Sequence, residues 1–187
     1  MKAAVEQLTG GRCYHMVETD NPGHVELWHR VLDGEIDALG EVLGGYVAAV
    51  DFPASMFWRE LAAANPGAAV VLSTRRSADV WWESCDRTVW AAMRERRSEG
   101  ADDAWTQMAM RLMERFASNW SDRSASIAAH DAHVAEVRAT IAADRLVEMT
   151  PEMGWAPLCE ALALEVPDDD YPRRNDSASF RQNHGWD

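Results

Sequence analysis

Residues 68–84 read AAVVLSTRRSADVWWES, and this stretch decides the fold class. The apolar run at 68–72 has the length and composition of a strand that is buried on both faces of a sheet. The polar residues 73–76 then form a turn, and a helical pattern continues over about 78–94. A buried strand that leads directly into a helix predicts an α/β protein with a parallel sheet.

The rest of the chain repeats this alternation of strands and helices. Further short apolar runs predict strands at 12–16, 46–50 and 145–149. Helical patterns lie at 1–9, 25–31, 36–43, 53–64, 102–117, 123–142 and 155–164. We therefore expect a mostly parallel sheet of about four strands with helices on both faces. No repeat or linker interrupts the pattern, so residues 1–187 are predicted to form one domain with an extended tail at 167–187.

The charge balance limits the partners that the protein can have. The chain has 18 Lys and Arg residues against 31 Asp and Glu residues, a formal net charge of −13. This surplus of acid disfavours nucleic acid and anionic membranes as partners. No apolar run approaches the roughly 20 residues that cross a bilayer, and the first residues lack the apolar stretch of a secretory signal. We expect a cytoplasmic protein that binds a small molecule, and neither nucleic acid nor a membrane.

The cysteines and histidines do not indicate a metal site. Cys13, Cys85 and Cys159 are odd in number and widely spaced, without a CxxC pair. Reduced thiols are therefore expected rather than a disulfide framework. His130 and His133 are spaced for one face of a helix, but no cysteine or carboxylate pattern completes a tetrahedral site. No metal is predicted.

Candidate catalytic residues stand at the carboxyl ends of the predicted strands, where parallel α/β sheets bind their ligands. His15 and Asp51 end two of these strands. Either can remove a proton from an alcohol, and an imidazole suits this role because it titrates near neutrality. The alternative for His15 is a structural hydrogen bond to the backbone. His24 follows a Pro-Gly turn and either borders the same cleft or belongs only to a loop.

Arg76 and Ser84 form a candidate anion site. Arg76 lies in the turn between strand and helix, and Ser84 follows eight residues later, two helical turns into the helix. A guanidinium and a hydroxyl in these places can share one phosphate with the helix N-terminus. Alternatively, Arg76 pairs with a carboxylate and Ser84 is a surface serine. The chain contains no GxSxG and no GxGxxG motif, so esterase and dinucleotide-binding readings lack support.

Several short motifs occur in an order and spacing that are typical of one family. They are RCYHM at 12–16, NPGH at 21–24, VDFP at 50–53, FWREL at 57–61, VLSTRR at 71–76, WWES at 81–84, HVAEVR at 133–138, GWAPLC at 154–159 and YPRRND at 171–176. With these motifs, the chain resembles the bacterial and fungal sulfotransferases that use 3′-phosphoadenosine 5′-phosphosulfate (PAPS). The resemblance extends along almost the whole chain.

The resemblance implies a P-loop-type α/β fold, a three-layer sandwich, and transfer of a sulfuryl group from PAPS to a hydroxyl of a small apolar acceptor. By the resemblance, Arg76 and Ser84 match the pair that holds the 3′-phosphate of PAPS. Asn175 matches a stretch near the nucleotide. His15 or Asp51 would then activate the acceptor.

The chain contains nine tryptophans, an unusually high number. They either fill the core and a subunit interface or make an apolar surface for the acceptor. In the second case, the acceptor pocket is expected to include His24, Trp28, Trp58 and Trp82.

The sequence departs from the family pattern at two places. Ser77 and Ala78 stand where family members usually have Asp and Pro. Family members also begin with a strand and a glycine-rich phosphate loop ahead of the helix at 1–9, and that strand would lie between those at 46–50 and 68–74. Loss of the loop's hydrogen-bond donors to the 5′-phosphosulfate predicts an impaired sulfotransferase, since one such donor contributes roughly 3–4 kcal/mol.

Two alternatives follow from this departure. The first is a non-catalytic sulfotransferase-fold protein for binding or assembly, and the second is a different reaction in the same cleft. A sheet without its central strand exposes two edges. A homo-oligomer that covers these edges is therefore also expected.

Overall fold

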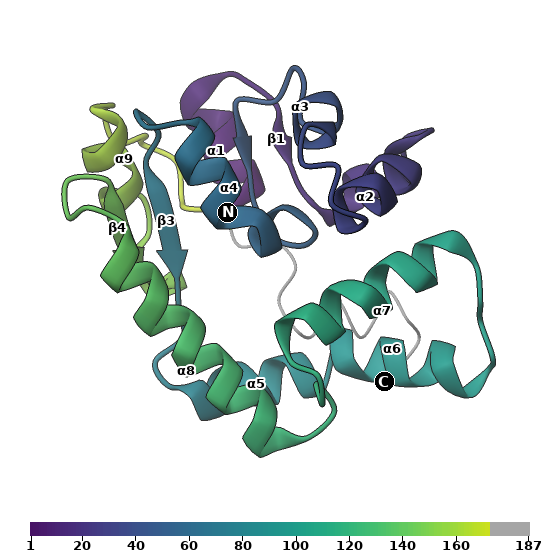
Figure 1. The fold of residues 1–187 in the computed structure, drawn as a ribbon. Coiled ribbons are helices and arrows are strands. Elements are labelled where there is room, and N and C mark those ends of the chain that lie inside the picture. Colours follow the sequence, from purple (N-terminus) through teal and green to yellow (C-terminus); the bar gives the residue numbers. More distant parts are fainter. Residues whose placement is uncertain (173–187) are drawn as a thin grey trace. The chain divides into compact units, whose positions relative to one another are not determined.

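The computed structural model describes residues 1–172, which fold into two compact units (Figure 1). Unit 1 consists of Met1–Ala68 and Asp102–Phe116, and unit 2 consists, among the described residues, of Ala69–Ala101 and residues 117–172. Both units combine short parallel strands with helices. The predicted α/β class is therefore confirmed.

Unit 1 contains two very short strands and several helices. β1 (Cys13–Tyr14) and β2 (Ala48–Ala49) pair in parallel, in the register that places Tyr14 opposite Ala49. A Cβ atom on Gly11 would lie only 2.6 Å from the side chain of Val47, so the chain needs glycine where it enters β1. The helical segments are α1 (Lys2–Thr9), η1 (Met16–Asp20), α2 (His24–Leu32), α3 (Ala38–Val42), η2 (Ala54–Phe57), α4 (Trp58–Ala64) and α7 (Ala104–Phe116).

The core of unit 1 forms where α2 and α7 pack together. Trp28 and Val31 of α2, and Met108 and Leu112 of α7, are almost completely buried and are spaced by three or four residues. This is the spacing of one helix face. Burial of a side chain of this size stabilises a fold by about 1.5–3 kcal/mol. Tyr14 belongs to the same cluster, so the core also fixes the position of β1.

Unit 2 contains the strand and the helix predicted from residues 68–84. β3 (Val70–Ser73) pairs in parallel with β4 (Leu146–Met149), and the two strands lie side by side in Figure 1. The helical segments are α5 (Ala78–Asp86), α6 (Val89–Ser98), α8 (Arg123–Thr140), η3 (Pro151–Met153) and α9 (Ala156–Leu162). α5 packs against α6 and α8, and α9 packs against β4.

The prediction of one sheet with about four strands is wrong for the residues that the structure describes. Their strands form two separate parallel pairs, β1 with β2 and β3 with β4. The predicted strands at 12–16 and 46–50 are reduced to two residues each. β1 stops because η1 begins at Met16, and β2 is soon followed by a left-handed backbone at Asp51. Apolar runs predict where strands form but not which strands pair, because pairing depends on tertiary packing.

The prediction of a single helix at 78–94 is also wrong, because the structure has two helices there, α5 and α6. Thr88 lies between them with φ −127° and ψ −98°, outside the helical region. Its hydroxyl donates a hydrogen bond of 2.6 Å to the carbonyl oxygen of Ser84. Thr side chains compete in this way with the helical hydrogen bonds of the backbone. Within residues 1–172, none of the helices is both long enough and apolar enough to cross a membrane.

Candidate active site

His15 and Asp51 meet at the carboxyl ends of β1 and β2 in unit 1. Because these strands are parallel neighbours, the residues that follow them lie at the same edge. The Nε2 atom of His15 lies 3.4 Å from Oδ2 of Asp51. The His15 side chain is 20% exposed and the Asp51 side chain 49% exposed. The structure therefore brings the two candidate catalytic residues together, with the carboxylate about half exposed.

The second ring nitrogen of His15 is engaged by the backbone. His15 is the N-terminal cap of η1, and its Nδ1 atom accepts a hydrogen bond of 3.3 Å from the N–H group of Val17. A neutral imidazole that accepts at Nδ1 carries its proton on Nε2. The hydrogen-bond pattern thus assigns a tautomer in which the Nε2–H group of His15 points toward Asp51.

Asp51 has an unusual backbone and a perturbed carboxyl group. Its φ is 62°, in the left-handed region that non-glycine residues rarely adopt. Strain of this kind often marks functional positions. Desolvation by neighbouring atoms raises the pKa of the Asp51 carboxyl, against the opposing effects of His15 and of the Phe52 N–H group. A carboxylate with a raised pKa is a better proton acceptor near neutral pH.

His24 and Trp28 lie with Tyr14 in a second hydrogen-bonded group of unit 1. The indole Nε1 of Trp28 donates to the Tyr14 hydroxyl at 2.7 Å, and this hydroxyl lies 3.3 Å from Nδ1 of His24. The Tyr14 and His24 rings stack, with centroids 5.7 Å apart and planes 13° from parallel. Trp28 is completely buried in the core. Its place in an acceptor pocket stays a prediction, as does that of half-buried His24.

The other two tryptophans predicted for the acceptor pocket belong to different units. Trp58 begins α4 of unit 1 and is 9% exposed, with the Arg59 guanidinium 4.6 Å from its ring centroid. Trp82 lies on α5 of unit 2 and is 8% exposed. Both are buried, and their role in binding an acceptor stays a prediction.

Arg76 is exposed in unit 2, directly before the N-terminus of α5. It forms no ion pair with any residue in the described part of the chain, and neither does Arg75. The alternative in which a carboxylate neutralises Arg76 therefore gains no support within residues 1–172. The guanidinium remains available for an anion.

The turn between Arg76 and α5 keeps a helix cap despite its departure from the family pattern. The Ser77 hydroxyl accepts a hydrogen bond of 3.2 Å from the N–H group of Val80. Serine caps helices as well as aspartate does. Ser84 is half-buried and follows Ser77 by seven residues, on the same helix face and about 10 Å further along the axis.

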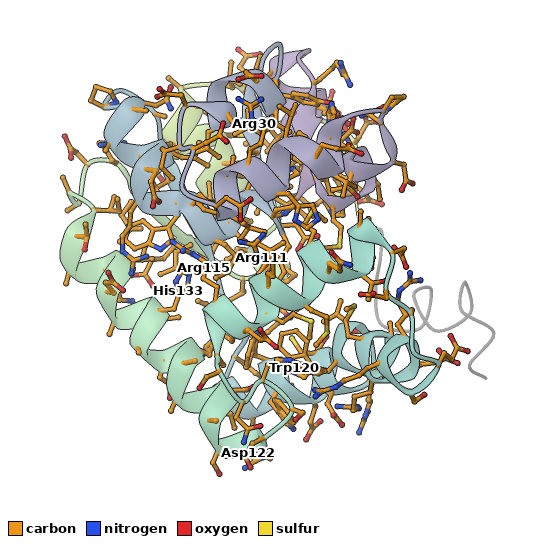
Figure 2. The ribbon with its side chains drawn as sticks, turned by 45° about the vertical axis from the view of Figure 1, so that its right-hand side comes forward. Arg30, Arg111, Arg115, Trp120, Asp122 and His133 are labelled. Carbon is orange, nitrogen blue, oxygen red and sulfur yellow. The ribbon has the colours of Figure 1, made fainter. Side chains whose placement is uncertain are left out.

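An ion pair that the sequence did not reveal lies beside this turn. Asp79 in the first turn of α5 pairs with Arg123, the first residue of α8. α8 is in turn capped by Asp122, whose Oδ1 atom accepts a hydrogen bond of 2.8 Å from the Ala125 N–H group (Figure 2). The two residues of the pair are 44 positions apart in sequence. Only the packing of α5 on α8 could disclose it.

Aromatic packing accounts for several tryptophans of unit 2. The Trp81 ring lies 4.5 Å from the His130 ring and 6.3 Å from that of Trp90, between centroids. Trp90 lies 5.8 Å from Trp120, which Figure 2 labels. Nδ1 of His130 also lies 3.1 Å from Asp131. His130 thus packs as an aromatic residue of this cluster.

Two further predictions from the sequence concern a metal site and Asn175. Among residues 1–172, no group of three or more His, Cys, Asp or Glu side chains could hold a metal ion. His133 is half-buried on α8 (Figure 2). Asn175, expected near the nucleotide, lies outside the described residues.

Comparisons with known proteins agree with this combination of elements. A family model described as a sulfotransferase domain matches residues 1–180. The chain is also 30% identical over 185 residues to a protein of Aspergillus versicolor named Ava biosynthesis cluster protein M. That match covers 87% of this chain and 71% of the fungal protein. Because the family model covers nearly the whole sequence, the chain belongs to the sulfotransferase family.

Proposed function

We propose that this protein transfers a sulfuryl group from PAPS to a hydroxyl group of a small, largely apolar acceptor, on a P-loop-type three-layer fold. Membership of the sulfotransferase family supports the reaction class. The fungal relative is named as a biosynthesis cluster protein, which favours a small-molecule acceptor over a macromolecule. The net charge of −13 also disfavours nucleic acid and anionic lipid as acceptors.

The exposed guanidinium of Arg76 is the observation that carries the proposal. In a protein with a surplus of carboxylates, this side chain has no ionic partner among residues 1–172. It precedes a capped helix N-terminus, whose N–H groups and dipole also favour anions. In our proposal Arg76 holds the 3′-phosphate of PAPS through charge-assisted hydrogen bonds, and the Ser84 hydroxyl adds a neutral one.

Asp51 is the proton acceptor in the proposed reaction. The acceptor oxygen attacks the sulfur atom, the bond from sulfur to the 5′-phosphate oxygen breaks, and adenosine 3′,5′-bisphosphate leaves with that bond's electrons. The proton of the acceptor hydroxyl passes to a carboxylate oxygen of Asp51. His15 is less suited to accept it, because Nδ1 is bonded to Val17 and Nε2 carries a proton that faces Asp51. His15 instead holds the carboxylate in place.

Isothermal titration with adenosine 3′,5′-bisphosphate tests the nucleotide site. Arg76→Ala should raise the Kd at least about tenfold, because a hydrogen bond to a charged group contributes about 1.5–3 kcal/mol. Arg97→Ala is the matched control, since Arg97 is also exposed in unit 2 and forms no ion pair within residues 1–172. It should change the Kd less than twofold.

The outcomes separate the proposal from its alternatives. Absence of heat at millimolar ligand, or equal effects of the two substitutions, would overturn the proposed nucleotide site. Binding without sulfuryl transfer from labelled PAPS to any acceptor would favour a non-catalytic binding or assembly protein. Light scattering then distinguishes a homo-oligomer, which the assembly alternative requires, from a monomer.

A further inference from the structure

Trp28, Tyr14 and His24 form a chain of hydrogen bonds with a defined direction. An indole N–H group can only donate, so the Tyr14 oxygen accepts from Trp28. Tyr14 is 0% exposed, and its hydroxyl proton has no access to water. Nδ1 of His24, 3.3 Å away, is the acceptor that this proton requires. A buried hydroxyl proton without an acceptor would cost about 1–3 kcal/mol.

This direction determines the tautomer of His24. An imidazole that accepts at Nδ1 and is neutral carries its proton on Nε2. Burial raises the pKa of the Tyr14 hydroxyl to about 12 despite the hydrogen bond from Trp28, so Tyr14 keeps the proton that it donates. The stacked ring of Tyr14 also holds the plane of the imidazole. Tyr14 is thus a positioning residue for His24.

The Nε2–H group of His24 is the free end of this chain. His24 is half-buried at the first position of α2, and its Nε2 atom has no hydrogen-bond partner among residues 1–172. Its ring stacks on Tyr14, the residue directly before His15 in the chain. An N–H donor that is fixed in this way suits an oxygen atom that carries lone pairs.

We infer that His24 binds the acceptor substrate by donating a hydrogen bond from Nε2 to its oxygen atom. The inference rests on the proposed sulfuryl transfer. In this inference the two side chains have different roles. Asp51 accepts the proton of the acceptor hydroxyl, and His24 donates a hydrogen bond to a lone pair of the same oxygen. Because Nδ1 is engaged by Tyr14 and Nε2 is protonated, His24 is not the base. The acceptor must therefore offer an oxygen in a largely apolar frame.

Three related aromatic probes differ in whether they can donate or accept a hydrogen bond. Their direct binding in the absence of PAPS therefore tests the role of His24 as a donor separately from that of Asp51 as a proton acceptor. 2-Naphthol can both donate and accept, 2-methoxynaphthalene can only accept, and naphthalene can do neither. Because the probes fluoresce, their Kd values can be measured by fluorescence titration. In the wild type, 2-methoxynaphthalene should bind more tightly than naphthalene by about three- to tenfold, the size of one neutral hydrogen bond.

Two substitutions of His24 form a matched pair. His24→Gln places an amide N–H group close to the position of Nε2, whereas His24→Asn places it close to Nδ1. His24→Asn should remove the preference for 2-methoxynaphthalene over naphthalene, and His24→Gln should retain most of it. Equal affinities of these two probes for the wild type, or an equal loss for both probes in His24→Asn, would overturn the inference.

Nitrogen NMR of the His24 imidazole reports which ring nitrogen carries the proton. Tyr14 would not affect this property if its role were only structural. In the wild type, Nδ1 of His24 should resonate as an unprotonated nitrogen and Nε2 as a protonated one. Tyr14→Phe should abolish this preference. A wild-type Nδ1–H tautomer would overturn the inference. Because neither measurement uses PAPS, failure here is distinguishable from failure of Arg76 to bind adenosine 3′,5′-bisphosphate.

Discussion

The two units of this protein use their charged side chains differently. In unit 1, four arginines lie beside carboxylates, in the pairs Arg12–Glu18, Arg30–Glu41, Arg111–Asp33 and Arg115–Glu60. Figure 2 labels three of these arginines. Unit 2 also contains ion pairs, but Arg75 and Arg76 form none with any residue up to position 172. The guanidinium groups of these four arginines of unit 1 thus lie beside carboxylates, whereas Arg75 and Arg76 at the turn before α5 have no carboxylate partner among residues 1–172.

The units also differ in how their functional groups are held. In unit 1, hydrogen bonds engage Nδ1 of His15 through the Val17 N–H group and Nδ1 of His24 through the Tyr14 hydroxyl. In unit 2, the Arg76 side chain is exposed, and only the adjacent helix cap at Ser77 is fixed. Proton transfer demands precise geometry, whereas a guanidinium can reach a phosphate from several rotamers. The comparison is consistent with the proposal that places proton transfer in unit 1 and anion binding in unit 2.

Asp51→Asn should give the largest effect, because it removes the proposed proton acceptor of unit 1. We expect kcat for transfer from labelled PAPS to 2-naphthol to fall by about 10²–10⁴-fold, while the Kd for adenosine 3′,5′-bisphosphate changes less than twofold. Asp37→Asn, an exposed carboxylate of the same unit, is the control and should retain the wild-type kcat. If Asp51→Asn also weakened the binding of adenosine 3′,5′-bisphosphate, the proposal that unit 1 transfers the proton and unit 2 binds the nucleotide would be wrong.

Glu18→Gln should give the next largest effect, on the stability of unit 1. The Glu18 carboxylate accepts hydrogen bonds from Tyr46 at 2.8 Å and from Asn21 at 3.2 Å, and it lies 3.2 Å from the ammonium group of Lys2. Desolvation alone would raise the pKa of this carboxyl, but these contacts outweigh it and lower the pKa to about 2. After allowance for solvent screening, the substitution should reduce the free energy of unfolding at pH 7 by about 1–2 kcal/mol.

The pH dependence of this effect has a defined sign. Because the folded-state pKa is depressed, the contribution of Glu18 is complete above the unfolded value of about 4.5 and is lost as the pH falls toward 2. Urea unfolding at several pH values should therefore show wild type and Glu18→Gln converging between pH 4.5 and 2. Glu114→Gln, an exposed change on α7, should remain close to wild type throughout. A stability difference that stayed constant with pH would contradict the prediction.

The Asp79–Arg123 pair should give the smallest effect, and it tests anion binding by unit 2. Asp79 stands in the first turn of α5, where its charge repels a phosphate held by Arg76. Arg123→Ala should weaken binding of adenosine 3′,5′-bisphosphate about two- to fivefold, and Asp79→Asn should strengthen it by a similar factor. The effects are small because both side chains are more than half exposed.

A double mutant provides the control for this pair. Asp79→Asn combined with Arg123→Ala should return the Kd close to that of the wild type, and all differences should shrink at high salt. Arg123→Ala could instead weaken nucleotide binding equally in the wild type and in the Asp79→Asn background. Arg123 would then contact the nucleotide directly, and the proposal that it neutralises the charge of Asp79 would be wrong.

Much of the candidate site could be predicted from the sequence, because simple rules apply to strand ends. His15 and Asp51 follow short apolar runs, and the rule that parallel strands end at one edge places them together. Tyr14 and Arg123 were missed. Tyr14 alternates to the opposite side of β1 from His15 and reads as a core residue, while Arg123 meets its partner only through helix packing.

The sequence by itself determined what depends on neighbours within a few positions. The strand-to-helix transitions, the Ser77 cap, the acidic balance and the family motifs are all of this kind. Tertiary structure alone decided which strands pair, that Trp28 is buried in the core, that Tyr14 lies between Trp28 and His24, and that Arg76 lacks an ionic partner among residues 1–172. The physical reason is that these properties arise from contacts between distant residues, which exist only after the chain has packed.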